Sequence, residues 1–182
     1  MMLSILICTI DGRADMLGNL LSHLKKQCNN NVELLVGYGK ESTGAKRQKL
    51  IERAKGDYVV FIDDDDWVPD YYVSEMLAGC SSGLDCMAIN GIMTTDGLHE
   101  TKWYLGKDFK NEDRREGNKT VYYRHTNHIT AVKREIALKA GFPNKSNAED
   151  KYYSDRLQLK TEYKIERPMY HYRFSTRNKT YK

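Results

Sequence analysis

The chain has 182 residues, 40% of them hydrophobic and 30% charged, and its formal net charge is +4 at pH 7. This length suits one domain with a buried core, so we expect a single domain over residues 1–182. The mild excess of positive charge suits an anionic ligand such as a diphosphate. It falls short of the strongly basic composition of a dedicated nucleic-acid binder.

The cysteines and the apolar segments indicate a cytoplasmic protein. The four cysteines, at positions 8, 28, 80 and 86, form no CxxC pair and no Cys–His pattern with zinc spacing, which favours free thiols over a disulfide framework. The apolar start, Met1–Ile10, lacks a preceding basic segment and is too short to span a membrane. We therefore expect a cytoplasmic chain without a membrane span.

The first half of the chain alternates between strands and helices. Leu3–Cys8 is a continuous apolar run, typical of a strand buried on both faces. Leucines then recur at helical spacing over residues 17–27. Val32–Val36, Thr43–Lys55 and Tyr58–Ile62 predict a strand, a helix and a strand. This order predicts a parallel sheet with crossover helices, half of a nucleotide-binding α/β domain.

The second half is less regular. The charged segment 106–119 has few apolar residues and predicts a mobile surface loop. Asn147 is a candidate cap for a helix that continues to about Leu159. The other predicted elements are a helix over 70–77, strands over 85–93 and 99–104 around a turn at 95–97, a short helix over 133–140, and one or two strands within 162–172.

Four consecutive aspartates, Asp63 to Asp66, directly follow the predicted strand Tyr58–Ile62. Neighbouring carboxylates repel one another and need solvent or a cation, and ligands of open α/β sheets bind beyond the carboxyl ends of the strands. Because alternate residues can face the same way, Asp63 and Asp65 can share a cleft while Asp64 points elsewhere. Their oxygens favour Mg²⁺ or Mn²⁺, with Asp66 in a structural role. The alternative is a solvated loop in which an aspartate caps the helix that begins near Asp70.

The run AKGDYVVFIDDDDWVPDYY (54–72) resembles the core of family 2 glycosyltransferases with the GT-A fold. The segment LSILICTIDGRADMLGNLLSHLKKQ (3–27) is similar to their opening strand, Thr-x-x-x-Arg loop and first helix, and GAKRQKLIERAKGD (44–57) resembles their Gly-Ala-Arg-Asn helix. The match covers about residues 3–77. It implies a Rossmann-like α/β fold with a mixed, mostly parallel sheet flanked by helices, residues 1–95 binding a nucleotide sugar and residues 96–182 supplying the acceptor site and the catalytic base.

The resemblance also implies roles for single residues on the donor side. The metal, Mn²⁺ or Mg²⁺, would be held by Asp63 and Asp65 and by the C-terminal His171, which a core position explains equally well. At Val36–Gly39 the family commonly has two aspartates, the first of which contributes to recognition of the donor base. No aspartate is present here, so Tyr38 or Asp11 is the candidate for that contact. The expected donor-binding residues are Thr9, Asp11, Arg13, Tyr38, Lys46, Arg47, Asp64 and Arg173.

On the acceptor side, residues 129–158 are similar to the segment that carries the family's Glu-Asp motif. This likeness implies that Asp150 takes the proton of the acceptor hydroxyl and that Glu149 orients the acceptor. The alternative is a pair of acidic residues that complement a helix dipole. Trp103, Asn127 and His128 are the candidate acceptor contacts. A basic tail of Arg173, Arg177, Lys179 and Lys182 is a candidate flap over the donor diphosphate.

The sequence therefore predicts an inverting, metal-dependent glycosyltransferase. The expected donor is a UDP-sugar, and the expected acceptor is a saccharide or a hydroxymethylated base in DNA. Two alternatives stay open. One is a sugar nucleotidyltransferase, although its usual Gly-rich signature with Arg and Lys after the first strand is absent. The other is a non-catalytic nucleic-acid-binding module that uses the basic, tyrosine-rich second half.

Overall fold

The computed structural model describes residues 1–176. The first half follows the predicted order, and each element lies within a few residues of its expected bounds. A parallel sheet begins here, since β1 pairs in parallel with both β2 and β3. The elements are β1 (Leu3–Cys8), α1 (Ala14–Lys25), β2 (Val32–Gly37), α2 (Thr43–Arg53) and β3 (Tyr58–Phe61).

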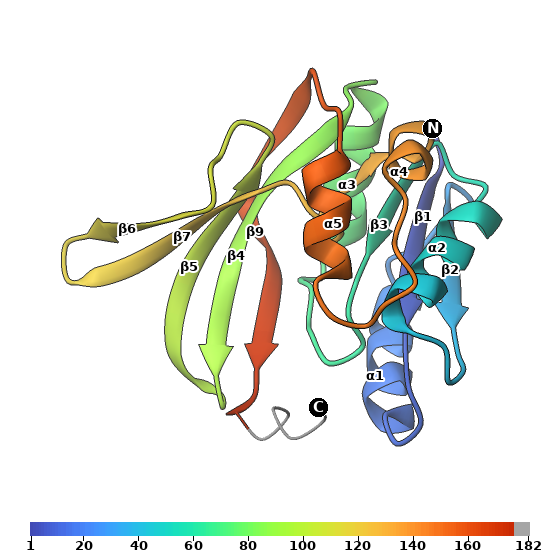
Figure 1. The fold of residues 1–182 in the computed structure, drawn as a ribbon, viewed down its shortest axis with the longest axis horizontal. Coiled ribbons are helices and arrows are strands. Elements are labelled where there is room, and N and C mark those ends of the chain that lie inside the picture. Colours follow the sequence, from blue (N-terminus) through green and yellow to red (C-terminus); the bar gives the residue numbers. More distant parts are fainter. Residues whose placement is uncertain (177–182) are drawn as a thin grey trace.

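Helices cover both faces of this parallel part of the sheet (Figure 1). Leu3, Ile5 and Ile7 of β1 belong to a core cluster with α1 and with α3 (Tyr72–Ser81). Leu6 belongs to a second cluster on the opposite face, which includes residues of α2. Because alternate residues of β1 enter two cores, the strand has no solvent-exposed face, and this explains its apolar run, in which Ser4 is the one polar residue.

The second half extends the same sheet with longer strands. Its elements are β4 (Cys86–Thr95), β5 (Leu98–Gly106), β6 (Glu112–Glu116), β7 (Lys119–His125), β8 (Val132–Lys133), α4 (Arg134–Ala140), α5 (Glu149–Arg156) and β9 (Glu162–Phe174). Within residues 1–176 the strand order is β2-β1-β3-β8-β4-β5-β7-β6, and β9 pairs with β4 in parallel. The sheet is mixed and flanked by helices, as predicted.

The prediction of a mobile loop over 106–119 is wrong. This segment contains β6, which forms a hairpin with β7. The hairpin lies at the left of Figure 1 and projects away from the helices. Charged side chains stabilise the hairpin across its strands, because Arg124 bonds to Asp113 at 2.6 Å and Arg114 packs over the Tyr123 ring. Strand β6 lies at the edge of the sheet and has no buried residue, so its sequence shows no apolar alternation.

The expected cap of α5 is also wrong. The helix begins at Glu149 after Ala148, which has a positive φ of 56°, and no side chain caps it. The reason is that α2 holds the preceding segment: the Gly44 amide donates to the Lys145 carbonyl at 2.9 Å. A Cβ atom on Gly44 would lie 1.9 Å from the Pro143 carbonyl oxygen, so this close approach requires glycine.

The four cysteines are free thiols, as predicted. Of the helices within residues 1–176, none combines the length and the hydrophobicity that crossing a bilayer requires.

Candidate active site

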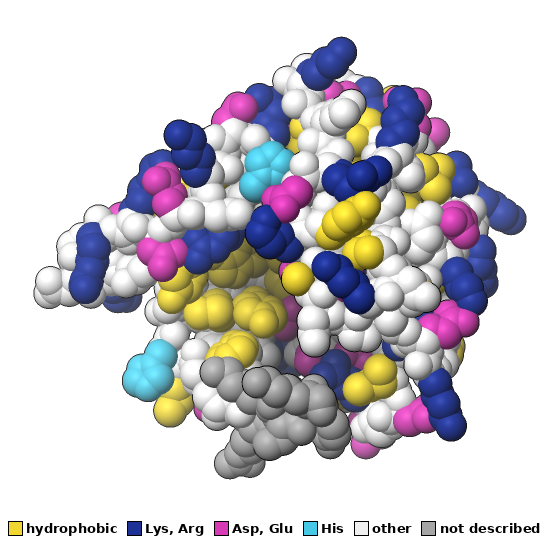
Figure 2. Space-filling model, viewed as in Figure 1, with side chains coloured by type: hydrophobic (Ala, Val, Ile, Leu, Met, Phe, Trp, Pro, Cys, Tyr) yellow, Lys and Arg dark blue, Asp and Glu magenta, His cyan; other side chains and the backbone are white. Residues whose placement is uncertain are grey.

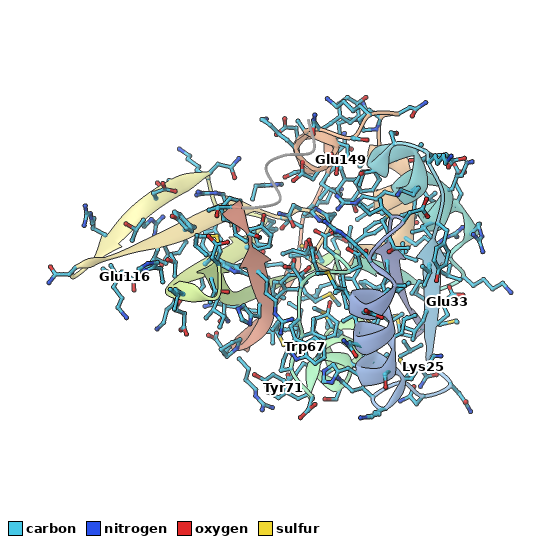
Figure 3. The ribbon with its side chains drawn as sticks, turned by 90° about the horizontal axis from the view of Figure 1, so that it is seen from below. Lys25, Glu33, Trp67, Tyr71, Glu116 and Glu149 are labelled. Atoms are coloured by element: carbon cyan, nitrogen blue, oxygen red, sulfur yellow. The ribbon has the colours of Figure 1, made fainter. Side chains whose placement is uncertain are left out.

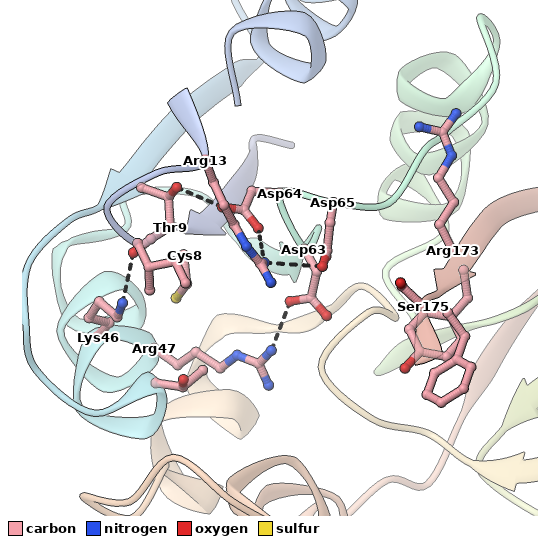
Figure 4. Close-up of a pocket in the computed structure, with 14 residues that line it drawn as sticks. Cys8, Thr9, Arg13, Lys46, Arg47, Asp63, Asp64, Asp65, Arg173 and Ser175 are labelled. Carbon is pink, nitrogen blue, oxygen red and sulfur yellow. Dashed lines mark hydrogen bonds and ion pairs between the residues drawn. The ribbon is translucent and has the colours of Figure 1, made fainter. Parts of the chain in front are cut away.

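A pocket of about 360 Å³ lies at the carboxyl ends of β1 and β3, where an open α/β sheet binds ligands (Figure 4). Strand β1 and the loop after it supply one wall, α2 supplies a second, and the end of β9 supplies a third. The lining residues are Cys8, Thr9, Ile10, Arg13, Thr43, Lys46, Arg47, Asp63, Asp64, Asp65, Tyr172, Arg173, Phe174 and Ser175.

Three consecutive aspartates line this pocket, and each contacts a cationic or hydroxyl side chain. Asp64 is buried and accepts hydrogen bonds from Thr9 Oγ1 and Arg13 Nη1, both at 2.6 Å. Asp65 lies 3.1 Å from the same Arg13 nitrogen, and its side chain is 24% exposed. Asp63 contacts Arg47 and His128. Asp64 thus lines the pocket together with Asp63 and Asp65 and does not point away from them.

The electrostatic surroundings of these carboxylates differ. Burial alone would raise the pKa of Asp63, but the charges of Arg47 and His128 outweigh it and hold that pKa well below its usual range. The pKa of Asp65 is raised, first by burial and then by repulsion from Asp63 and Asp64, against the opposing effect of Arg13. The pocket therefore contains a carboxylate whose charge is incompletely compensated, and a bound cation would relieve this repulsion.

The residues fit a divalent metal that is bound together with a phosphate ligand. Asp63 and Asp65 present hard carboxylate oxygens to the same pocket. Within residues 1–176, no three His, Cys, Asp or Glu side chains are arranged to hold a metal ion. Two carboxylates completed by phosphate oxygens and water are an arrangement that Mg²⁺ commonly uses at phosphate-transfer sites.

His171 does not reach this group. Its Nε2 atom lies 2.8 Å from Thr94 Oγ1, and the residue does not line the pocket. Its backbone pairs with that of Trp67 in both directions, with N–O distances of 3.1 and 2.8 Å. Trp67 in turn stacks on His23 of α1, on the side of the molecule opposite Glu149 (Figure 3). In this structure His171 ties β9 to the loop of residues 63–67 after β3, which we call the aspartate loop. The metal-binding role of His171 stays a prediction.

Tyr170 and Asp66 link the aspartate loop to β9 through hydrogen bonds. The Tyr170 hydroxyl donates to Asp66 Oδ2 at 2.8 Å and accepts from the Asp63 amide at 3.1 Å. Asp66 also accepts from the Arg173 amide at 2.7 Å. Burial and the nearby Asp63 raise the pKa of Asp66 to about 8. These contacts agree with the structural role expected for Asp66, and sequence reasoning missed Tyr170.

The other predicted donor-binding residues divide into two groups. Thr9, Arg13, Lys46, Arg47, Asp64 and Arg173 line the pocket. Lys46 is buried, and its Nζ donates to the Thr9 carbonyl at 2.7 Å. Asp11 and Tyr38 do not line the pocket, and Tyr38 is 66% exposed. Of the predicted basic flap, Arg173 packs over Trp67 at 5.2 Å, whereas Arg177, Lys179 and Lys182 lie outside the described residues.

A second, larger hollow of about 870 Å³ adjoins the first, between the start of α5 and the strands β4, β5, β7 and β9. Figure 2 shows hydrophobic side chains on its floor and charged ones at its rim. The apolar lining residues are Met93, Trp103, Leu105, Tyr122, Ile129, Tyr172 and Phe174. The structure also brings five predicted residues together here: Trp103, Asn127, His128, Glu149 and Asp150.

The rim of this hollow contains a pair that the sequence did not indicate. Asp113 of β6 and Arg124 of β7 line it, joined by their ion pair. Asp113 lies in the segment that was expected to be a loop, and Arg124 lies in the strand that pairs with it. The signal that was available is the run KTVYYRH (119–125), whose β-branched and aromatic residues favour a strand.

The two pockets meet at Arg47, Asp63, Tyr172 and Phe174, which line both, and the first two carry charge. Arg47 Nη2 donates to Asp63 Oδ1 at 2.9 Å, and its Nη1 lies 3.0 Å from Glu149 Oε1. His128 Nε2 lies 3.4 Å from Asp63 Oδ2. Asp150 directly follows Glu149, is partly exposed, and accepts a hydrogen bond from the Lys151 amide. A carboxylate-rich pocket thus opens into an apolar hollow that holds a further carboxylate, Asp150.

Comparison with known proteins agrees with this geometry. Residues 6–138 match the model of Glycosyl transferase family 2. The chain belongs to this family. "Putative glycosyltransferase EpsH" of Bacillus subtilis (strain 168) is 31% identical over 85 residues, which cover 47% of this chain and 24% of that protein.

Solved structures of S. aureus TarS share the fold. TarS 1-349 in complex with UDP has a TM-score of 0.68 and 16% identity, over 96% of this chain and 61% of that one. TarS 1-349 in complex with UDP-GlcNAc has a TM-score of 0.63 and 13% identity, over 95% of this chain and 58% of that one. The likeness confirms the GT-A fold. The chain spans less than two thirds of the length of each of these proteins.

Proposed function

We propose that the chain is a glycosyltransferase that moves a sugar from a nucleoside-diphosphate donor to an acceptor hydroxyl. The observation that carries this proposal is the meeting of two pockets at Asp63 and Arg47. One pocket presents the aspartate cluster to a ligand, and the other presents Asp150. Membership of glycosyl transferase family 2 supports the same reaction class.

The donor side binds the diphosphate of a UDP-sugar. TarS is a structural neighbour with solved complexes of UDP and UDP-GlcNAc, which supports uridine as the base. Asp63 and Asp65 would hold Mn²⁺ or Mg²⁺, and the bound metal supplies positive charge for the leaving diphosphate. Arg13 and Arg173 add cationic side chains to the same pocket, where they can neutralise phosphate oxygens.

On the acceptor side, Asp150 takes the proton of the attacking hydroxyl. The acceptor oxygen then forms a bond to the anomeric carbon, and the bond from that carbon to the diphosphate oxygen breaks. A single displacement of this kind inverts the anomeric centre. General-base catalysis by a positioned carboxylate contributes roughly 10² to 10⁴ in rate.

A saccharide is the acceptor that the second pocket suits best. Its floor combines apolar side chains with the rings of Trp103 and Tyr122, and such rings pack against the C–H faces of sugars. The ion pair of Asp113 and Arg124 supplies hydrogen-bonding groups at the rim. A hydroxymethylated base in DNA is the alternative acceptor.

A thermal-shift panel of nucleoside diphosphates and their sugars, with and without Mn²⁺, tests the proposal. A ligand at 100 times its dissociation constant stabilises the folded state by about 2.7 kcal/mol. We expect the largest shift with UDP-sugars, and only when the metal is present. Transfer to saccharides or to hydroxymethylated DNA then identifies the acceptor.

Three results would contradict the proposal. If no nucleotide stabilised the protein, the proposed donor site would be wrong. Release of pyrophosphate from UTP and a sugar phosphate would indicate a sugar nucleotidyltransferase. Metal-independent DNA binding that falls steeply with salt, without sugar transfer, would indicate a nucleic-acid-binding module.

A further inference from the structure

One buried arginine lies between the two pockets. The Arg47 side chain is 5% exposed and extends from α2 toward the aspartate loop (Figure 4). Its Cζ atom lies 5.5 Å from the ring centre of Phe61 and 5.8 Å from that of Phe142. Since aromatic rings surround the guanidinium, its charge has to be balanced by the few carboxylates within reach.

Two carboxylates share this guanidinium unequally. Nη2 makes a directed hydrogen bond to Asp63. Nη1 lies 3.0 Å from Glu149 Oε1 but outside hydrogen-bond geometry, and within residues 1–176 neither Nη1 nor Nε has a hydrogen-bond partner. Buried donors without partners are costly, and an arginine has five N–H groups to place. The Cys8 thiol also interacts with this guanidinium. Arg47 therefore has donors beside Glu149 that lack a directed hydrogen bond to a carboxylate.

The segment that carries Glu149 is held in a strained conformation. Ala148 has a φ of 56°, a region that residues with a Cβ rarely adopt. Glu149 itself is buried and is the first residue of α5, and Asp150 is the second. A stronger bond between Arg47 and Glu149 would therefore order the helix turn that positions Asp150.

We propose that Arg47 is a positioning residue that couples the donor pocket to Asp150. A ligand that binds the Asp63 carboxylate weakens its bond to Arg47. The guanidinium can then form directed hydrogen bonds to Glu149, and these bonds order the first turn of α5. The consequence for catalysis rests on the proposed function, whereas the coupling itself is a property of the free protein. Lysine cannot replace Arg47, because a single ammonium lacks the planar fork that reaches two carboxylates.

The substitution Asp63→Asn tests the coupling without any ligand, since it weakens the hold of residue 63 on Arg47. The readout is hydrogen exchange at the Tyr152 amide, which donates to the Ala148 carbonyl. We expect exchange there to slow about tenfold, the effect of strengthening one charge-assisted hydrogen bond. The control is Asp65→Asn, the same charge change at a residue whose ion pair is with Arg13, and it should leave Tyr152 unchanged.

The same measurement in an Arg47→Lys background completes the cycle. With lysine at position 47, Asp63→Asn should no longer slow exchange at Tyr152. Amides of α1 report any change in global stability and serve as the internal reference. Unchanged or faster exchange at Tyr152 in the Asp63→Asn protein would overturn the proposal, and so would equal slowing in the Arg47→Lys background.

Adding UDP and Mn²⁺ to the unmodified protein separates this coupling from the proposed function. We expect protection of residues 9–13 in the donor pocket and, with it, protection of Tyr152. Absence of protection at 9–13 would count against the UDP donor, while the ligand-free cycle still decides the coupling. Protection at 9–13 without protection at Tyr152 would overturn the coupling of donor binding to α5.

Discussion

The two pockets differ in how far apart in the chain their parts lie. Apart from residues 172–175, the proposed donor pocket is built from residues 8–65, in which strands and helices alternate and neighbours in sequence are neighbours in space. The proposed acceptor pocket draws its floor from strands that span residues 93–174 and its rim from the β6–β7 hairpin. Local patterns therefore describe the first pocket well, while the second depends on long-range strand pairing.

The largest effect that we expect separates the two pockets functionally. Asp150→Asn should lower the rate of sugar transfer by roughly 10² to 10⁴, because it removes the base but changes neither shape nor packing. Binding of the donor nucleotide should stay within about threefold of the original, measured by calorimetry. The matched control is Asp155→Asn, on the same helix in an exposed pair with Lys151. Undiminished transfer by Asp150→Asn would refute the assignment of the base.

The next effect concerns the long-range pairing of the acceptor half. A Cβ atom on Gly91 of β4 would lie 2.1 Å from the Tyr170 carbonyl oxygen of β9 and 2.5 Å from the Trp103 ring. Gly91→Ala should therefore lower the free energy of unfolding by about 1–3 kcal/mol, measured by urea denaturation.

Gly18→Ala in α1 is the control for Gly91→Ala. A Cβ atom at Gly18 would have no neighbour within 4 Å, and the residue lies inside a helix. Alanine there should raise stability by roughly 0.5–1 kcal/mol, because glycine is a poor helix former. Equal destabilisation by both substitutions would show that the pairing of β4 with β9 is no more sensitive to an added methyl group than α1 is.

These differences explain what the sequence could reveal. The run YVVFI predicted β3, and the aspartates after it predicted where ligands approach, because a buried strand and its carboxyl end are local features. The placement of Asp150 came from a family resemblance and not from spacing. The position of His171 was not predictable, because it depends on β9 pairing with β4 about 80 residues earlier in the chain. No local pattern reports such a register.

A smaller effect concerns the start of β9. Asp85 precedes β4 and accepts hydrogen bonds from the Lys160 and Thr161 amides at 2.9 and 3.1 Å. Burial would raise its pKa, but these bonds and Lys133 outweigh burial and lower that pKa. Since the folded-state pKa is depressed, Asp85 contributes stability above its unfolded pKa of about 3.9 and loses it as the pH falls through the folded value.

Asp85→Asn should therefore lower the free energy of unfolding on the order of 1–3 kcal/mol at pH 7. The difference from the unmodified protein should shrink as the pH falls below about 4, because the unfolded chain then takes up a proton at Asp85 that the native state takes up only at a lower pH. Urea denaturation at several pH values measures it. A difference that stays constant from pH 7 to pH 3 would show that the Asp85 charge does not tie the two strands together.

The smallest effect lies where the two halves meet. Ala148 carries the left-handed backbone conformation that precedes α5, and a glycine there adopts the same φ of 56° without strain. Ala148→Gly should raise the melting temperature slightly, with a gain of up to about 1 kcal/mol, reduced by the greater freedom of glycine in the unfolded chain. If α2 rather than the residue type imposes this conformation, the substitution should leave the exchange of the Gly44 amide, which bonds to Lys145, unchanged. Faster exchange at Gly44 would instead mean that Ala148 itself helps to hold the segment before α5 against α2. The contact between the two halves would then depend on the residue at position 148.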